Sequence, residues 1–370
     1  MFSGPPSSPL RRPLTPAGSP ARPNAPMDSR LDALRAWLSS IAARHAVDVA
    51  SLVPASADAS FRRYFRVDAG DGTTLIVMDA PPDREDSAAF VHVAGLMAEA
   101  GLRVPHVVEQ DLAQGFLLLT DLGTRTYLSV LDGADPTAAA PLMSDAIDAL
   151  VAWQRASRPD VLPAYDEALL RRELALFPDW YVARHLGLEL DADQQATLAS
   201  AFDAIVAHNS AEARVYVHRD FMPRNLMLGT PGTGLVGNPG VLDFQDAVYG
   251  PISYDIASLC KDAFLSWDEE PVLDWTVRYW ERAKKAGLPV PADFGQFYRD
   301  VEWMGLQRHL KVLGIFSRIH YRDGKSHYLA DTPRFIGYVR ATANRYRALG
   351  PLLKLLDALE GRVVEVGYTF

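Results

Sequence analysis

Hydrophobic and polar positions divide the chain into a short β-rich part and a longer helical part. Apolar residues recur every three or four positions over 31–41, which predicts an amphipathic helix. Apolar and polar residues alternate over 61–67, a glycine-containing turn follows at 68–72, and an apolar run covers 73–78, so this stretch predicts a β-hairpin. The other elements predicted for this part are one helix and two strands, at 87–100, 107–110 and 115–120.

Beyond residue 120 the periodicity is mainly helical. The predicted helices cover 141–155, 165–186, 191–209 and several segments after 251, and two short apolar strands cover 215–217 and 240–242. This order predicts an α+β fold with a small β-rich N-lobe over 29–121 and a larger, mainly helical C-lobe over 122–370. Residues 1–28 are rich in proline and poor in large apolar side chains, so we expect a disordered leader there.

Composition and charge exclude several classes of function. A formal net charge of -9 argues against general affinity for nucleic acid or anionic membranes. The single cysteine, Cys260, excludes an intramolecular disulfide and a thiolate metal cluster. No apolar run reaches the roughly 20 residues that span a bilayer, and the N-terminus lacks the pattern of a secretory signal. We therefore expect a cytoplasmic protein without a nucleic acid or membrane partner, and a monomer by default.

One stretch of the C-lobe carries catalytic residue types at a defined spacing. His218, Asp220 and Asn225 follow a short strand in the pattern His-x-Asp-x-x-x-x-Asn, and a second strand ends at Asp243. Transfer of a phosphoryl group to a hydroxyl needs a carboxylate that orients the hydroxyl and accepts its proton, and magnesium held by oxygen ligands. Asp220 fits the first role, and Asn225 and Asp243 fit the second. We expect the two strands to be adjacent, because their ends would then hold these groups around one point.

This pattern resembles the catalytic loop and metal-binding aspartate of the protein-kinase-like fold, and above all those of the aminoglycoside phosphotransferases. The resemblance implies Asp220 as catalytic base, Asn225 and Asp243 as magnesium ligands, and ATP and Mg²⁺ as cofactors. It also implies that His218 supports the loop and that Asp255, in a similar Tyr-Asp-Ile-Ala segment, braces it. The bare pattern also arises by chance, but the second aspartate and the order of the two lobes favour the functional interpretation.

The N-lobe departs from the usual kinase pattern because it contains no lysine. The first lysine of the chain is Lys261, and Met78 stands where related kinases have the lysine that holds the α- and β-phosphates. Met78 is thus expected at the nucleotide site, with Arg62, Arg66 or Arg84 as a replacement cation. The alternatives are that magnesium and backbone groups hold the phosphates and that these arginines are solvated hairpin positions.

The remaining nucleotide contacts are expected at a loop and at the lobe junction. Residues 57–61 take the place of the glycine-rich loop of protein kinases, and the hydroxyl of Ser60 could face the phosphates. Adenine is expected beside Thr120 and Leu122, which would contribute backbone groups. A plain edge strand and turn is the alternative for this junction.

Within the phosphotransferases, the chain is similar to the bacterial anomeric sugar kinases of cell-wall recycling, which phosphorylate the 1-hydroxyl of N-acetylmuramate and N-acetylglucosamine. The similar segments include 56–67, 75–82, 174–181, 243–247 and 307–323. The methionine in place of lysine is part of this likeness. The resemblance implies this activity, with an amino sugar as the small-molecule partner in peptidoglycan recycling.

Residues that bind the sugar are less sharply indicated. Arg308, Lys311 and Arg318 lie in one predicted helix, and an arginine suits the lactyl carboxylate of muramate. The alternative is a solvated helix face. Asp246, three residues beyond Asp243, is a candidate for hydrogen bonding to a sugar hydroxyl.

Other functions stay open on sequence grounds. An acidic patch of Asp262, Asp268, Glu269 and Glu270 would suit an aminoglycoside, although it could equally be a solvated loop. Choline, homoserine and fructosamine are further acceptors to consider. A pseudokinase would keep the fold without needing the catalytic residues. A zinc hydrolase built on His218 and Asp220 lacks a third nitrogen or sulfur ligand at helical spacing.

Overall fold

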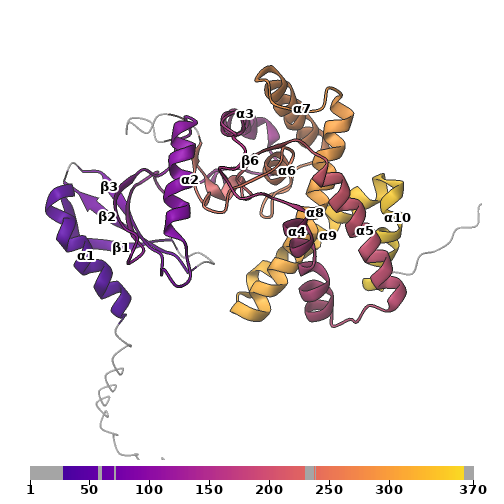
Figure 1. Cartoon of the computed structure of the whole chain (residues 1–370), viewed down its shortest axis with the longest axis horizontal. Helices are drawn as coiled ribbons and strands as arrows, with labels where there is room; N and C mark the ends of the chain where they lie inside the picture. The colour runs from indigo at the N-terminus through magenta and orange to yellow at the C-terminus, as the bar shows by residue number, and fades with distance from the viewer. Residues whose placement is uncertain (1–27, 57–60, 71, 230–236, 238, 362–370) are drawn as a thin grey trace, which may run out of the picture.

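The computed structural model describes residues 28–56, 61–70, 72–229, 237 and 239–361. It has the predicted α+β architecture, a small β-rich N-lobe beside a larger helical C-lobe (Figure 1). The predicted leader falls outside the described residues except for Asp28, whose carboxylate accepts a hydrogen bond from the Leu31 N–H and caps the first helix. No helix of the described chain combines the length and the apolar composition needed to cross a membrane.

The N-lobe is a five-stranded antiparallel sheet in the order β1-β2-β3-β5-β4. Its elements are α1 Ser29–His45, β1 Val47–Ser56, β2 Arg63–Ala69, β3 Thr74–Asp79, α2 Ser87–Glu99, β4 Val107–Asp111 and β5 Phe116–Thr120. The predicted hairpin is β2 and β3, and the predicted strand pair is β4 and β5. Strand β1 was not predicted, because serine, alanine and proline interrupt its alternation of apolar and polar residues.

Each face of this sheet is covered by one helix. Successive side chains of a strand point to opposite faces, so Phe65 and Val67 pack with Leu38 of α1 on one face. On the other face, Met78 belongs to a hydrophobic cluster that includes α2 and continues into the C-lobe. Helix α2 accordingly lies between the sheet and the C-lobe (Figure 1). The two lobes are therefore joined by a shared hydrophobic core.

The C-lobe is built mainly from helices around the long helix α8. Its helices are η1 Tyr127–Ser129, α3 Pro136–Arg155, α4 Glu167–Leu174, η2 Phe177–Leu186, α5 Ala192–Ser210, η3 Pro223–Asn225, α6 Tyr254–Cys260, α7 Glu269–Lys285, α8 Phe294–Asp323, η4 Ser326–Asp331, α9 Thr332–Arg345, η5 Arg347–Leu349 and α10 Gly350–Leu359. The single helix predicted over 165–186 is two helices, α4 and the π-helix η2. Helix α8 packs closely on this segment, because a Cβ at Gly314 would stand only 2.3 Å from the carbonyl oxygen of Leu176.

Four short strands complete the C-lobe, and they correct one prediction. These strands are β6 Arg214–Val217, β7 Leu226–Met227, β8 Gly240–Val241 and β9 Val248–Pro251. We expected β6 and β8 to be adjacent, but β6 pairs with β9 and β8 pairs with β7. Strands β7 and β9 are too short to show a periodicity, so the sequence pattern missed them. The ends of β6 and β8 still lie close together, because Nε2 of His218, directly after β6, lies 3.0 Å from the carbonyl oxygen of Leu242, directly after β8.

Candidate active site

Asp220 lies in a loop after β6 that is held by a buried carboxylate from another element. The carboxylate of Asp255, at the start of α6, accepts hydrogen bonds from the backbone N–H groups of His218 at 2.7 Å and Arg219 at 3.0 Å. Arg219 has a φ of 77°, a left-handed conformation that is uncommon for a residue with a side chain. Burial raises the pKa of Asp255 to about 7, while its backbone hydrogen bonds oppose that shift.

His218 connects this loop to the segment after β8. Its Nε2 lies 3.0 Å from the carbonyl oxygen of Leu242, and its Nδ1 lies 3.2 Å from the backbone nitrogen of Asp220. Burial lowers the pKa of His218 to about 4, so the ring is neutral near pH 7. A neutral ring that donates from Nε2 and accepts at Nδ1 satisfies both contacts. His218 therefore positions the backbone of Asp220 relative to the segment that leads into Asp243.

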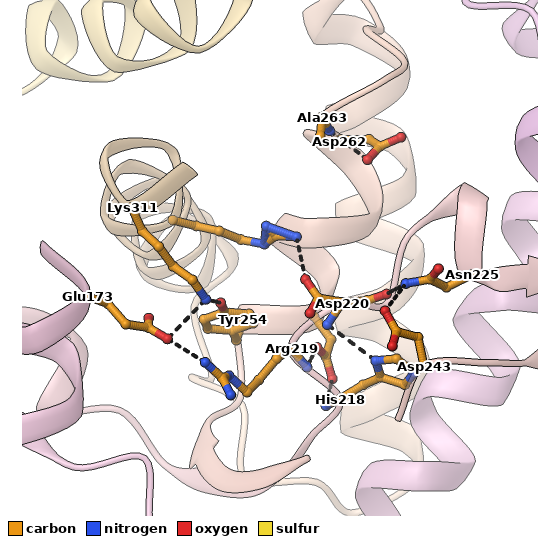
Figure 2. Close-up of polar contacts among 12 residues, drawn as sticks. Glu173, His218, Arg219, Asp220, Asn225, Asp243, Tyr254, Asp262, Ala263 and Lys311 are labelled. Atoms are coloured by element: carbon orange, nitrogen blue, oxygen red, sulfur yellow. Dashed lines mark hydrogen bonds and ion pairs between the residues drawn. The ribbon is translucent and has the colours of Figure 1, made fainter. Parts of the chain in front are cut away.

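Asn225 and Asp243 lie side by side next to Asp220 (Figure 2). The side-chain nitrogen of Asn225 donates to the backbone oxygen of Asp220 at 2.9 Å and to Oδ2 of Asp243 at 3.3 Å. Asp243 has a φ of 61°, and its Oδ1 accepts a hydrogen bond from Gln245 at 2.8 Å. The amide oxygen of Asn225 and the carboxylate of Asp243 are the types of oxygen ligand that Mg²⁺ prefers.

A pocket of about 310 Å³ lies between the lobes and ends at these two residues. Its walls include Ile76, Phe90 and Leu119 from the N-lobe, and Asn225 and Asp243 from the C-lobe. The described lining residues do not include Asp220, whose side chain is 40% exposed. Asn225 and Asp243 thus line the pocket, whereas Asp220 lies outside its described lining.

The residues predicted to bind nucleotide are placed unevenly around this pocket. Arg66, Thr120 and Leu122 line it. Met78 is fully buried in the cluster that α2 covers, so it lies behind the described pocket wall. Ser60 lies outside the described residues.

The arginines of the N-lobe are paired with carboxylates. Nη2 of Arg62 lies 2.8 Å from Glu85, and Nη2 of Arg66 lies 3.1 Å from Asp121 at the lobe junction. Both side chains are largely buried, so the solvated alternative is wrong for them. Arg84 is exposed and contacts only its neighbour Asp83 among the ion pairs of the described chain, so for Arg84 that alternative is correct.

The pocket lining also includes Arg224, a cation from the C-lobe. It directly precedes Asn225 in the motif, and its guanidinium carbon lies 4.8 Å from the centre of the Phe264 ring. Sequence reasoning missed it, although its position next to a predicted ligand, within the first 260 residues that contain no lysine, was an available signal.

A buried charge network borders Asp220 on the side opposite Asn225 and Asp243 (Figure 2). Oε1 of Glu173, from α4, lies 3.0 Å from Nζ of Lys311 and 2.6 Å from Nη2 of Arg219. The hydroxyl groups of Tyr165 and Tyr254 hydrogen-bond to Glu173 and Lys311, respectively. Burial alone would raise the pKa of Glu173, but the charges of Lys311 and Arg219 outweigh it and lower that pKa to about 2. Glu173 was not predicted, since nothing in α4 distinguishes it from a surface glutamate.

The predicted sugar-binding residues of α8 do not form one group. Arg308 and Lys311 are 4% and 7% exposed, so the solvated-face alternative is wrong for them. Nη2 of Arg308 lies 3.6 Å from Oδ1 of Asp220. Arg318 lies ten residues further along the helix, about 15 Å away along its axis. Asp246 is exposed, and its carboxylate lies 3.5 Å from the side-chain nitrogen of Gln245.

The charge of Asp220 is set by these neighbours. Burial would raise its pKa, yet the positive charges of Arg308, Lys311 and Arg219 hold that pKa below its ordinary value. Asp220 is therefore ionised near pH 7 and can accept a proton.

Two alternative functions depend on features that the described residues do not form, an open acidic patch for an aminoglycoside and a zinc site. Asp262 is fully buried, burial raises its pKa to about 6, and Glu269 is engaged by Arg345, so the four acidic residues do not form an open patch. Within the described ranges, no group of three or more His, Cys, Asp or Glu side chains could hold a metal, which argues against a zinc hydrolase. A magnesium site needs fewer protein ligands, since phosphates and water complete it.

Comparison with known proteins agrees with this geometry. The model of the phosphotransferase enzyme family matches residues 51–294. The N-acetylmuramate/N-acetylglucosamine kinase of Pseudomonas aeruginosa is 52% identical over 90% of this chain and 97% of its own length. The protein of the same name from Neisseria meningitidis serogroup B is 48% identical over 91% of this chain and 98% of its own.

Solved structures show the same fold at low identity. The ethanolamine kinase of Plasmodium vivax superposes with a TM-score of 0.57 at 11% identity, covering 87% of this chain and 89% of its own. A choline/ethanolamine kinase family protein from Mesorhizobium loti gives a TM-score of 0.55 at 15% identity, with 89% and 99% covered. The resemblance drawn from the catalytic motif is thereby confirmed, and the chain belongs to the phosphotransferase enzyme family.

Proposed function

We propose that this protein is an ATP-dependent kinase that phosphorylates the anomeric 1-hydroxyl of N-acetylmuramate and N-acetylglucosamine. The observation that carries the proposal is the placement of a reachable carboxylate, Asp220, directly beside the two oxygen donors that end the interlobe pocket. The relatives that bear the name of this activity support the choice of acceptor. Such a kinase would use cytoplasmic ATP and would act in peptidoglycan recycling.

The pocket would hold the nucleotide. The sugar would bind at Asp220, outside the described lining of that pocket. Apolar walls around Leu119 suit adenine, and the backbone near Thr120 and Leu122 can hydrogen-bond to its edge. Mg²⁺ held by Asn225 and Asp243 would offset the negative charge of the phosphates of bound ATP. This arrangement directs the phosphates toward the catalytic loop.

Asp220 would act on the acceptor hydroxyl. Its ionised carboxylate orients the hydroxyl and accepts its proton while the new bond from oxygen to the γ-phosphorus forms and the bond to ADP breaks. Asp255 and His218 hold the backbone N–H groups that lead into Asp220, and Asn225 holds its carbonyl oxygen, so the position of the carboxylate does not depend on the substrate.

Arg224 is proposed as the cation that replaces the missing lysine. We expect Arg224→Ala to raise the KM for ATP about tenfold, because a charge-assisted contact to a phosphate is lost. Arg62→Ala is the matched control and should change this KM less than about twofold, since Arg62 is bound to Glu85 away from the pocket lining. Steady-state kinetics at varied ATP concentration measures both values. Equal effects of the two substitutions would contradict this role for Arg224.

The acceptor can be tested by ATP consumption with N-acetylmuramate, N-acetylglucosamine, an aminoglycoside panel and choline. We expect turnover with the two amino sugars, with ³¹P NMR showing a phosphate on the anomeric carbon. The methyl glycoside of N-acetylglucosamine is the control, because its anomeric oxygen has no proton to lose. Phosphorylation of this glycoside would show that another hydroxyl reacts, and turnover with aminoglycosides alone would refute the amino-sugar assignment.

A further inference from the structure

Helix α8 places two cations, Arg308 and Lys311, beside the catalytic loop. They differ in how completely nearby carboxylates neutralise their positive charges. Nζ of Lys311 lies 3.0 Å from Glu173 and 3.1 Å from the hydroxyl of Tyr254. Glu173 is bound by Arg219 as well. The charge of Lys311 is therefore paired with Glu173, and its ammonium group also hydrogen-bonds within the protein.

Arg308 has weaker ion-pair and hydrogen-bond partners than Lys311. The carboxylate that pairs with it among the described residues belongs to Asp220, at 3.6 Å, which is longer than a charge-assisted hydrogen bond. Its Nε is buried and has no hydrogen-bond partner within the described ranges. The ring of Tyr254 lies 5.6 Å from its guanidinium carbon, and such a contact supplies no hydrogen-bond acceptor to the edge of the guanidinium. A buried guanidinium that lacks a bidentate partner is costly unless a ligand supplies one.

The proposed acceptors differ in the group that such a guanidinium would bind. N-acetylmuramate carries a lactyl ether at C3 that ends in a carboxylate, and N-acetylglucosamine has a hydroxyl there. C3 is separated from the reacting C1 by one ring carbon. A side chain 3.6 Å from the proposed base therefore lies within reach of this substituent. Arginine binds carboxylates through two parallel N–H bonds, which a hydroxyl cannot accept in the same way.

We propose that Arg308 binds the lactyl carboxylate of N-acetylmuramate and thereby sets the preference between the two sugars, whereas Lys311 only maintains the buried network. This inference rests on the proposed function, because it requires that both sugars are acceptors. It separates two residues that look equivalent in the sequence.

Kinetics of Arg308→Gln with both sugars tests the proposal. Arg308 also lies beside Asp220, so kcat should fall by a similar factor with both sugars. The ratio of kcat/KM for N-acetylmuramate to that for N-acetylglucosamine should fall about 30-fold, through KM, because only the carboxylate loses its charged partner. The comparison variant Lys311→Met should lower kcat/KM for both sugars by similar factors, since it disturbs the loop that both sugars need.

A second arm changes the substrate and needs no variant to fold. The lactyl amide of N-acetylmuramate should be used by the unaltered enzyme about 30-fold less well than the acid. Arg308→Gln should not distinguish acid from amide, because the partner of the carboxylate is gone.

The outcomes separate this inference from the proposed function. Equal losses for both sugars in Arg308→Gln, or equal use of acid and amide by the unaltered enzyme, would overturn the role of Arg308 while the kinase activity stands. No turnover of either sugar by the unaltered enzyme would refute the proposed function itself, and the inference with it.

Discussion

Replacing Asp220 by Asn is expected to lower kcat by roughly 10²- to 10⁴-fold while MgATP binds with nearly unchanged affinity. The amide has the shape of the carboxylate, but it cannot accept the proton of the acceptor hydroxyl. The backbone contacts that position the loop involve the N–H and C=O of Asp220, so they survive the substitution. The described pocket lining does not include Asp220, which is why nucleotide binding should persist.

Steady-state kinetics with N-acetylglucosamine, together with calorimetric titration of nucleotide, measures both effects. Asp274→Asn is the control, because it makes the same chemical change at an exposed carboxylate of α7 that pairs with Arg278 on the surface. Retention of full activity by Asp220→Asn would show that another group is the base. A parallel loss of nucleotide binding would instead indicate that the loop has collapsed.

Replacing Glu173 by Gln is expected to lower the free energy of unfolding at pH 7 by about 3–5 kcal/mol. The neutral amide keeps the volume of the side chain but leaves the buried charges of Lys311 and Arg219 without their anion. Removal of one of these cations at the same time, in Glu173→Gln with Lys311→Met, should recover part of the loss. Urea unfolding of the single and double variants measures these differences.

The effect of Glu173 should also depend on pH in a defined direction. Its pKa is lowered from an ordinary value of 4.5 to about 2, so its stabilisation is fully present above about pH 4.5 and is lost as the pH falls toward 2. The stabilisation from this shift is roughly 3 kcal/mol, which agrees with the loss expected at neutral pH. The stability difference between the unaltered protein and Glu173→Gln should therefore shrink progressively on acidification below pH 4.5.

Glu167→Gln provides the matched control in the same helix. Glu167 is exposed and pairs with Arg171 one turn away, so its substitution should change stability by no more than about 0.5 kcal/mol. Losses of similar size in both variants would contradict the role of the buried network. So would a Glu173→Gln difference that stays constant down to pH 3.

Local patterns of the sequence were sufficient for most elements and for the catalytic motif. Strands β2 to β5 and helix α2 follow from the spacing of apolar residues, because a strand or helix with one buried face repeats its side chains with a fixed period. His218, Asp220, Asn225 and Asp243 could be assigned because their residue types and spacing match the needs of phosphoryl transfer. The roles of these side chains stay predictions, although the structure does bring the four together.

Strand pairing and charge matching could not be read from the sequence. The expected adjacency of β6 and β8 was wrong because pairing depends on β7 and β9, which are too short to be recognised. The alternative of a solvated helix face for Arg308 and Lys311 was wrong, because the burial of a long cation depends on the elements packed against it. The partners that distinguish them come from α4, α6 and the catalytic loop, far away in the chain.

The sequence by itself therefore determined the class of the fold and the residues of the catalytic motif, because periodicity and local spacing are properties of neighbouring residues. Only the tertiary structure decided which cations are neutralised by Glu173 and which one faces Asp220. The physical reason is that the free energy of a buried charge depends on the groups that surround it in space. For this protein, those groups come from α4, the catalytic loop and α8, which are separate elements of the chain.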